Sequence, residues 1–385
     1  MKNNLDVLLV ARPDHSLSIY QALLKSNYLD FKFITFKVFP RFVKRILHSK
    51  KMVSLSKNVI VSYKLSIINI CKYTLNLRIA QNWNENDILN SLAGKLLKHN
   101  DAKIIHYWPE YGNSEILRYK KSHPDAVTLA DIHMPYPMVV FQQMIPIYER
   151  NGIDPQTTNL YILTQQHKDL LNGENSILVP SEFVADTYRS VFSDLKIHTV
   201  SYGITPSSYY SKKQGPVKQF VYAGRVSLEK GGDLLLEYFA NHPEFRLHIY
   251  GSIDKDQSAI FKRYEDLQNI VFHGQVPKVE LQKEMSKYDV GIHLSRFDAY
   301  SLAVGEMIGV GLPVIVSCNT GNKDDVVKYN FGCVTDLNLD SVSWAIQTMV
   351  NNYSVYTDSI SDYLLNKYTS YGDSMVNFYK KILNT

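Results

Sequence analysis

Two carboxylates with a short helix between them stand in the stretch of residues 290–317. Asp298 follows an apolar run that predicts a strand, and Glu306 lies on an apolar helix predicted over residues 302–310. The first N–H groups of a helix lack intrahelical partners and carry the positive end of its dipole, so they attract anions. A carboxylate about one turn further along can accept hydrogen bonds from hydroxyl groups. An anion held beside hydroxyls indicates a sugar nucleotide as the ligand.

Both carboxylates have a plainer alternative. Asp298 could cap the helix that starts near Ser301, and Glu306 could be an exposed helical residue. The helix is short, apolar and spotted with glycine, which favours burial against neighbouring elements. A lone glutamate in such a helix needs a polar partner, and a ribose diol would be one.

A second candidate for anion binding is the connection that follows the predicted strand of residues 219–224. Arg225 and Lys230 both lie in this strand-to-helix turn, beside glycines. Two cations at a strand end, next to a helix N-terminus, suit a diphosphate. The alternative is a charged surface turn. Because both candidate segments follow strands of the same predicted sheet, they converge on one edge of it.

Histidines follow two strands of the first half of the chain. His133 ends the predicted strand of residues 126–133, where it could hydrogen-bond a sugar or an acceptor, or could be an ordinary polar loop residue. Asp131 precedes it in the strand and is either its partner or on the other face of the sheet. His15 and Ser16, after the first strand, are further candidates for the same cleft.

Short apolar runs alternate with helical patterns along most of the chain, which is typical of α/β domains with parallel sheets. The strands are predicted at residues 5–11, 31–37, 103–108, 126–133, 176–181, 197–203, 219–224, 246–252 and 269–274, besides that leading to Asp298. Residues 204–218, rich in Ser, Pro, Gly and Lys, are typical of a linker. We therefore predict two doubly wound domains, 1–203 and 219–365. Ligands bind beyond the carboxyl ends of such sheets, so the domains should face each other across a cleft.

The net charge of +5 is unevenly distributed. Residues 31–84 contain no Asp or Glu, and basic residues are interleaved with apolar ones from Lys32 to Arg78. Segment 32–78 therefore suits an anionic membrane surface or a phosphorylated substrate, the alternative being a solvated face that lacks acids. No nucleic-acid motif accompanies the charge. The three scattered cysteines, and an N-terminus unlike a signal peptide, favour a cytoplasmic protein, peripheral on the inner face of the plasma membrane.

Several common site types have no counterpart in the sequence. There is no GxGxxG after the first strand, no Walker A sequence and no GxSxG elbow. No His, Cys or Asp cluster has the spacing of metal ligands. We therefore expect no metal and no tightly bound cofactor.

The motifs together resemble the retaining glycosyltransferases of family 4, within the glycosyl transferases group 1, which have the GT-B fold. GRVSLEKG, from Gly224, is similar to the family's G-R-x-x-x-x-K-G, and FDAYSLAVGEMIGVGLPVIVS is similar to its E-x7-E region. The resemblance covers the second domain well and the first loosely. It departs from the family at Asp298, where the family has Glu, and in the glycine-free ARPDHS after the first strand.

The resemblance implies a role for each matching residue. Arg225 and Lys230 would bind the donor diphosphate, with the amides of Ser301 and Leu302 on the distal phosphate and the sugar. Asp298, Ala299, Tyr300 and Glu306 would contact the donor sugar and ribose, Gly274 and Val276 would line the base, and His133, Asp298 and Glu306 would form the catalytic set. The final helix, within residues 366–385, would pack back on the first domain.

The expected function is transfer of a hexose-type sugar from a UDP- or GDP-linked donor, with retention, to a lipid-linked or surface polysaccharide acceptor, with lipopolysaccharide as one candidate pathway. Two alternatives stay open. One is a sugar-nucleotide epimerase with the GT-B fold, and the other is a non-catalytic sugar-nucleotide-binding protein of polysaccharide assembly.

Overall fold

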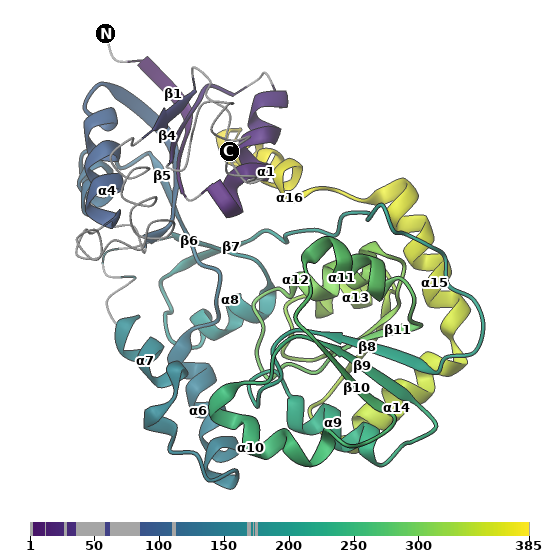
Figure 1. The fold of residues 1–385 in the computed structure, drawn as a ribbon. Coiled ribbons are helices and arrows are strands. Elements are labelled where there is room, and N and C mark those ends of the chain that lie inside the picture. The colour runs from purple at the N-terminus through teal and green to yellow at the C-terminus, as the bar shows by residue number, and fades with distance from the viewer. Residues whose placement is uncertain are drawn as a thin grey trace.

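The computed structural model describes residues 3–11, 13–26, 29–35, 58–61, 85–109, 113–167, 171, 173 and 176–384. Two parallel β-sheets dominate these residues, one built from the first half of the chain and one from the second (Figure 1). Within the described residues, no helix combines the length and the apolar character needed to cross a bilayer. Most of the basic segment 32–78 lies outside the described residues.

The first sheet has seven strands in the order β3-β2-β1-β4-β5-β6-β7. These are β1 (Asn3–Val10), β2 (Phe31–Thr35), β3 (Val59–Val61), β4 (Asn100–Tyr107), β5 (Val127–Asp131), β6 (Ser176–Val179) and β7 (Lys196–Thr199). The central strands are continuous apolar runs that are buried, as expected for a parallel sheet covered on both faces. The described helices that connect them include α1 (Pro13–Ser26), α4 (Glu85–Leu97), α5 (Ser114–Ser122) and α8 (Glu182–Arg189).

The second sheet has six strands in the order β10-β9-β8-β11-β12-β13. These are β8 (Gln219–Ala223), β9 (Arg246–Tyr250), β10 (Ile270–Gly274), β11 (Val290–His293), β12 (Val314–Ser317) and β13 (Gly332–Thr335). Its helices include α9 (Gly232–Ala240), α11 (Lys278–Met285), α12 (Leu302–Gly309), α13 (Lys323–Lys328), α14 (Leu339–Asn351) and α15 (Tyr353–Asp362). Between β9 and β10 the chain forms short helical turns around α10 (Ser258–Phe261) rather than one continuous helix.

Each sheet reverses its strand order beside its first strand. In the first sheet β1 lies between β2 and β4, and in the second β8 lies between β9 and β11. Loops diverge at such a switch point, so a crevice opens at the carboxyl ends of the two central strands. The predicted α/β architecture of two doubly wound sheets facing a cleft is confirmed.

One helical hairpin crosses from the first half of the chain to the second sheet. Helices α6 (Pro137–Arg150) and α7 (Asn159–Gln166) follow β5, yet their apolar side chains belong to the core of the second sheet. Figure 1 shows α6 and α7 away from β1 and β4 of the first sheet. The Tyr148 hydroxyl donates to Glu229 Oε1 at 2.6 Å and fixes the contact. By chain position this hairpin falls within the predicted domain 1–203, but its packing joins it to the second core.

The C-terminal helix α16 (Tyr371–Leu383) returns to the first sheet and packs against α1. Met375, Val376 and Tyr379 are buried in the first core. The returning chain passes Gly203, the residue just before the linker. Its φ of +70° suits glycine, and an added Cβ would lie 2.5 Å from the Thr369 carbonyl oxygen. The two connections between the sheets therefore run side by side.

Candidate functional site

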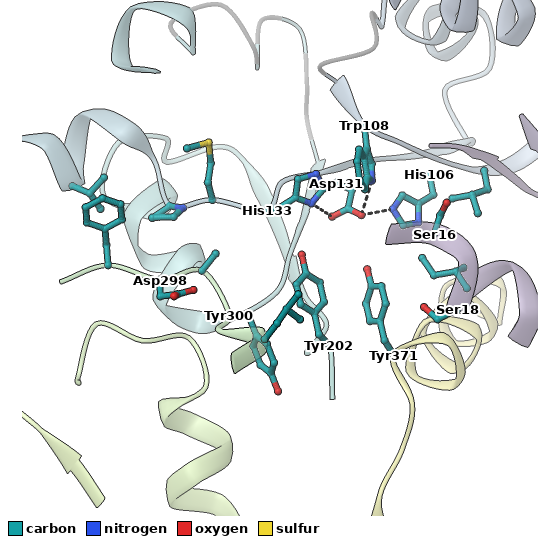
Figure 2. Close-up of a pocket in the computed structure, with 18 of the residues that line it drawn as sticks. Ser16, Ser18, His106, Trp108, Asp131, His133, Tyr202, Asp298, Tyr300 and Tyr371 are labelled. Atoms are coloured by element: carbon teal, nitrogen blue, oxygen red, sulfur yellow. Dashed lines mark hydrogen bonds and ion pairs between the residues drawn. The ribbon is translucent and has the colours of Figure 1, made fainter. Parts of the chain in front are cut away.

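A cavity of about 500 Å³ lies where the carboxyl ends of the two sheets face each other. Figure 2 shows side chains from both halves of the chain around it. The first half lines it with Ser16, Ser18, His106, Trp108, Asp131 and His133, among others, and the second half with Lys230, Phe297, Asp298, Ala299, Tyr300 and Leu302, whereas Tyr202 and Tyr371 come from the two connections. The cavity thus joins the predicted His133 to the predicted Lys230 and Asp298.

Asp298 binds two basic side chains on the second-sheet side of the cavity. Its Oδ2 accepts from Lys230 Nζ at 2.8 Å and lies 3.0 Å from His293 Nε2. Burial would raise the pKa of this carboxyl, but the His293 hydrogen bond and the nearby Lys230 charge outweigh burial and hold the pKa well below its usual range. Asp298 is therefore an anion at neutral pH, and its charge is engaged rather than capping α12.

Lys230 reaches the cavity because of the glycine that follows it. Gly231, at the N-terminus of α9, has φ +68°, and an added Cβ would lie 1.9 Å from the Leu294 carbonyl oxygen. The tight turn brings the Lys230 ammonium to the loop after β11. Arg225 lies outside the cavity lining, half-exposed and 3.3 Å from Asp254, so the structure brings together one of the two predicted cations with Asp298.

The N-terminus of α12 points its first amides toward the cavity side of the sheet. Ser301 caps the helix by accepting from the Val304 N–H at 3.4 Å, and its own N–H donates to Asn322 Oδ1 at 2.7 Å. The amides of Leu302 and Ala303 lack intrahelical acceptors by the geometry of a helix end. An anion at this end would therefore meet Leu302 and Ala303 rather than the Ser301 amide predicted from the sequence.

Glu306 lies on α12 in an ion pair with Lys278, the first residue of α11. The Glu306 carboxylate is mostly buried and the Lys278 ammonium is exposed. The residue predicted to bind the ribose is therefore paired with a solvent-accessible cation. Gly274, with φ +72°, ends β10. Val276 follows it and packs against the apolar cluster that contains Val304, Met307 and Ile308 of α12. The predicted ribose and base residues thus lie along one rim of the second sheet.

Tyr300 and Ala299 both form hydrogen bonds with other parts of the protein. The Tyr300 hydroxyl donates to Asp325 Oδ2 at 2.8 Å, and the Ser201 hydroxyl lies 3.0 Å from both of these oxygens. The Ala299 carbonyl accepts from Ser181 at 2.7 Å. The Tyr300 hydroxyl thus joins its loop to Ser201 and Asp325, so a sugar contact at Tyr300 would come from another part of the residue.

His133 lies on the first-sheet side of the cavity with a carboxylate behind it. Its Nδ1 is 3.6 Å from Asp131 Oδ1, and its ring lies 4.2 Å from the Trp108 ring, centroid to centroid. Asp131 also receives the Trp108 indole N–H at 3.1 Å. Of the two interpretations of Asp131, the structure supports the one in which it partners His133 (Figure 2).

Asp131 also begins a buried series of hydrogen bonds that ends at a residue of the C-terminal helix. His106 Nε2 lies 3.0 Å from Asp131 Oδ2, and His106 Nδ1 lies 2.6 Å from the Tyr379 hydroxyl. Burial would raise the pKa of Asp131, but the His106 hydrogen bond and the charges of His133 and His106 lower it below its ordinary value. Helix α16 thereby supports His106 and Asp131, which line the cavity.

The remaining predicted residues lie at the start of α1. Ser16 is buried and lines the cavity, whereas the side chain of His15 lies outside the described residues. Sequence reasoning missed His106, Trp108, His293, Tyr202 and Tyr371. His106 and His293 carried a signal, since each is a polar residue at or near the end of an apolar strand, but the aromatic residues carried none.

The described part of the chain contains no group of three or more His, Cys, Asp or Glu side chains placed to hold a metal ion. Among the described residues, the cavity instead combines two buried carboxylates, Asp131 and Asp298, with the cation Lys230, a helix N-terminus and His133. Chemically this set can bind an anionic leaving group and polar hydroxyls in one place.

The second domain matches a known family. Residues 210–362 fit the family model for glycosyl transferases group 1. These residues make up less than half of the chain and include Lys230, Asp298 and Glu306. No match was found among the curated protein sequences.

Solved structures of the same architecture extend the likeness to the whole chain. A sucrose-phosphate synthase from Thermosynechococcus elongatus superposes with a TM-score of 0.62 at 14% identity, over 100% of both chains. The Anabaena protein HepE in complex with UDP gives 0.60 at 11% identity, over 100% of both. A lipopolysaccharide outer core galactosyltransferase gives 0.60 at 15% identity, over 98% of this chain and 99% of that one. At these identities the likeness establishes the fold, which is the two-domain GT-B fold of glycosyltransferases.

Proposed function

We propose that this chain is a retaining glycosyltransferase that moves a hexose-type sugar from a UDP- or GDP-linked donor to a hydroxyl of a lipid-linked or polysaccharide acceptor. The observation that carries the proposal is the meeting of Lys230, Asp298 and the α12 N-terminus on the edge of the second sheet, opposite His133. The match of residues 210–362 to glycosyl transferases group 1 supports the same activity.

The donor diphosphate would lie between Lys230 and the amides of Leu302 and Ala303. A cation and an oriented helix end stabilise negative charge most strongly where water is excluded, and charge grows on the diphosphate as its bond to the sugar breaks. The ribose would bind to Glu306, and the nucleoside base would lie along Gly274 and Val276. Asp298 would face the transferred sugar.

In the reaction, the bond between the anomeric carbon and the diphosphate oxygen breaks, and a bond to the acceptor oxygen forms on the same face of the sugar. The acceptor proton passes to an oxygen of the departing diphosphate. The anionic Asp298 stabilises positive charge on the sugar ring, and His133 orients a sugar hydroxyl. Asp131 and Trp108 hold the His133 ring in place for this task.

The test is release of nucleoside diphosphate from a panel of UDP-, GDP- and ADP-linked sugars, with and without candidate acceptors. The proposal expects one donor family to be used, with release stimulated by an acceptor hydroxyl and the anomeric configuration retained in the product. Interconversion of donor sugars without acceptor would favour an epimerase. Binding without turnover of any donor would favour the non-catalytic alternative.

Replacing Glu306 by alanine is expected to raise the donor KM by about ten- to a hundredfold, because a charged hydrogen bond to the ribose is lost. The E306A variant should also cease to distinguish the ribose donor from its deoxyribose analogue. Steady-state kinetics on both donors measures the effect. Glu280→Ala, on the exposed face of α11, is the matched control and should change neither value. Discrimination that survives in E306A would remove the ribose assignment.

The basic segment 32–78 would dock the protein on the cytoplasmic face of an anionic membrane and bring it to a lipid-linked acceptor. The protein is expected to float with vesicles that contain anionic lipid and to detach as the salt concentration rises. Vesicles of neutral lipid are the control. Equal recovery with both kinds of vesicle, or no flotation with either at low salt, would refute membrane docking.

A further inference from the structure

A buried histidine stands behind the catalytic-site carboxylate and has no role in the function proposed above. His293 is the last residue of β11, and its side chain is 4% exposed. Its Nε2 lies 3.0 Å from Asp298 Oδ2, and its ring is nearly parallel to that of Tyr222, 6.0 Å away. We propose that His293 is the positioning residue for Asp298, and that it holds this carboxylate in place when Lys230 binds the donor diphosphate. The proposal rests on the donor site assigned above.

Lys230 and His293 both bind the same oxygen of Asp298. The two partners differ in mobility. The Lys230 side chain is 28% exposed on a flexible stem and can turn toward a diphosphate, whereas His293 is enclosed in the core at a strand end. Donor binding therefore removes one hydrogen bond from Asp298 and leaves the other. Without His293, the carboxylate would be mostly buried, uncompensated and free to change rotamer.

The geometry also assigns the proton on the ring. Nε2 faces a carboxylate that accepts hydrogen bonds, so Nε2 carries the hydrogen. Within the described residues, the buried Nδ1 has no hydrogen-bond partner. An unprotonated Nδ1 leaves only a lone pair unsatisfied there, so the neutral ring with its hydrogen on Nε2 is the form that fits. His293 thus acts as a fixed hydrogen-bond donor to Asp298.

Two variants separate hydrogen bonding from packing. His293→Leu fills the same space with an apolar side chain but removes the hydrogen-bond donor. His293→Gln places an amide N–H near the position of Nε2. We expect His293→Leu to lower kcat about ten- to a hundredfold with the donor KM changed less than about threefold, since one hydrogen bond to a charged group is lost in the complex. His293→Gln should recover most of this loss. The acidic limb of the kcat profile should move to higher pH in His293→Leu, because Asp298 loses the partner that favours its ionised form.

A double-mutant cycle with Asp298→Asn supplies a readout that does not need turnover. Urea unfolding at pH 7 should show coupling between positions 293 and 298, about tenfold in the unfolding equilibrium constant. In protein that already carries Asp298→Asn, the added His293→Leu change should have no further effect on kcat. His242→Leu, at a partly exposed position just after α9, controls for loss of any histidine.

The outcomes distinguish this role from the function on which it rests. Wild-type turnover with unchanged kcat in His293→Leu, or the absence of coupling in the unfolding cycle, would overturn the positioning role and leave the glycosyltransferase assignment standing. Absence of nucleoside diphosphate release by the wild-type protein from every donor would overturn the proposed function, and this role with it. A loss in His293→Leu that glutamine fails to restore would reduce His293 to a packing residue.

Discussion

Replacing Lys230 by methionine is expected to lower kcat/KM for the donor by about 10²–10³-fold, because it removes a cation from a site where negative charge develops on the leaving group. Lys230 is the cation that the described residues place in the cavity, 2.8 Å from Asp298 and on the same edge as the α12 N-terminus. Methionine preserves the length and apolar stem of the side chain. Steady-state measurement of nucleoside diphosphate release gives the value.

Variants of two other basic residues serve as controls for this result. Lys287→Met removes a lysine from an exposed ion pair with Glu284 and should leave kcat/KM unchanged. Arg225→Met should cause a smaller loss than Lys230→Met, since Arg225 is half-exposed, pairs with Asp254 and lies outside the cavity lining. A Lys230→Met variant that equals the Lys287→Met control would show that the diphosphate binds elsewhere.

Replacing Asp131 by alanine is expected to lower the free energy of unfolding by about 3–5 kcal/mol, the range for breaking one side of a buried charged cluster. Asp131 is 6% exposed and receives hydrogen bonds from both His106 and Trp108. Without it, the His106 ring and the Trp108 indole would both lose a buried hydrogen-bond acceptor. Urea denaturation followed by circular dichroism measures the change.

The pH dependence of this loss follows from the lowered pKa of Asp131. A carboxyl whose pKa is lower in the folded state contributes stability that is present above its unfolded pKa of about 3.9 and is lost as the pH falls through the folded value. The difference between wild type and Asp131→Asn should therefore be constant near neutral pH and shrink below about pH 4. Asp101→Asn, at a partly exposed carboxyl beside His123, should cause little change. An Asp131→Ala protein as stable as that control would contradict the buried cluster.

The strands of both sheets could be predicted because a parallel sheet buried on both faces needs continuous apolar runs. β8, β9 and β11 fall where those runs predict them. The placement of α6 and α7 on the second core could not be predicted, because nothing local to residues 137–166 says which sheet their apolar faces cover.

The second-sheet half of the site was predictable to a greater degree than the first. Lys230 and Asp298 each follow a strand, and strand order alone brings them to one edge. The Ser301 amide and the Tyr300 hydroxyl both have protein partners that lie far away in the sequence. The same is true of His106, whose contact with Tyr379 joins residues from opposite ends of the chain. Tertiary partners of this kind leave no local pattern.

The most direct test of the diphosphate site is calorimetric titration of UDP, GDP and ADP into the wild-type protein and the Lys230→Met variant. One of these nucleotides should bind the wild-type protein with one-to-one stoichiometry, and its affinity should fall about tenfold or more in Lys230→Met, as expected when a charge-assisted contact is lost. The corresponding nucleoside without phosphates should bind far more weakly than the diphosphate. Failure of all three diphosphates to bind, or equal affinity for wild type and variant, would contradict a donor site between Lys230 and α12.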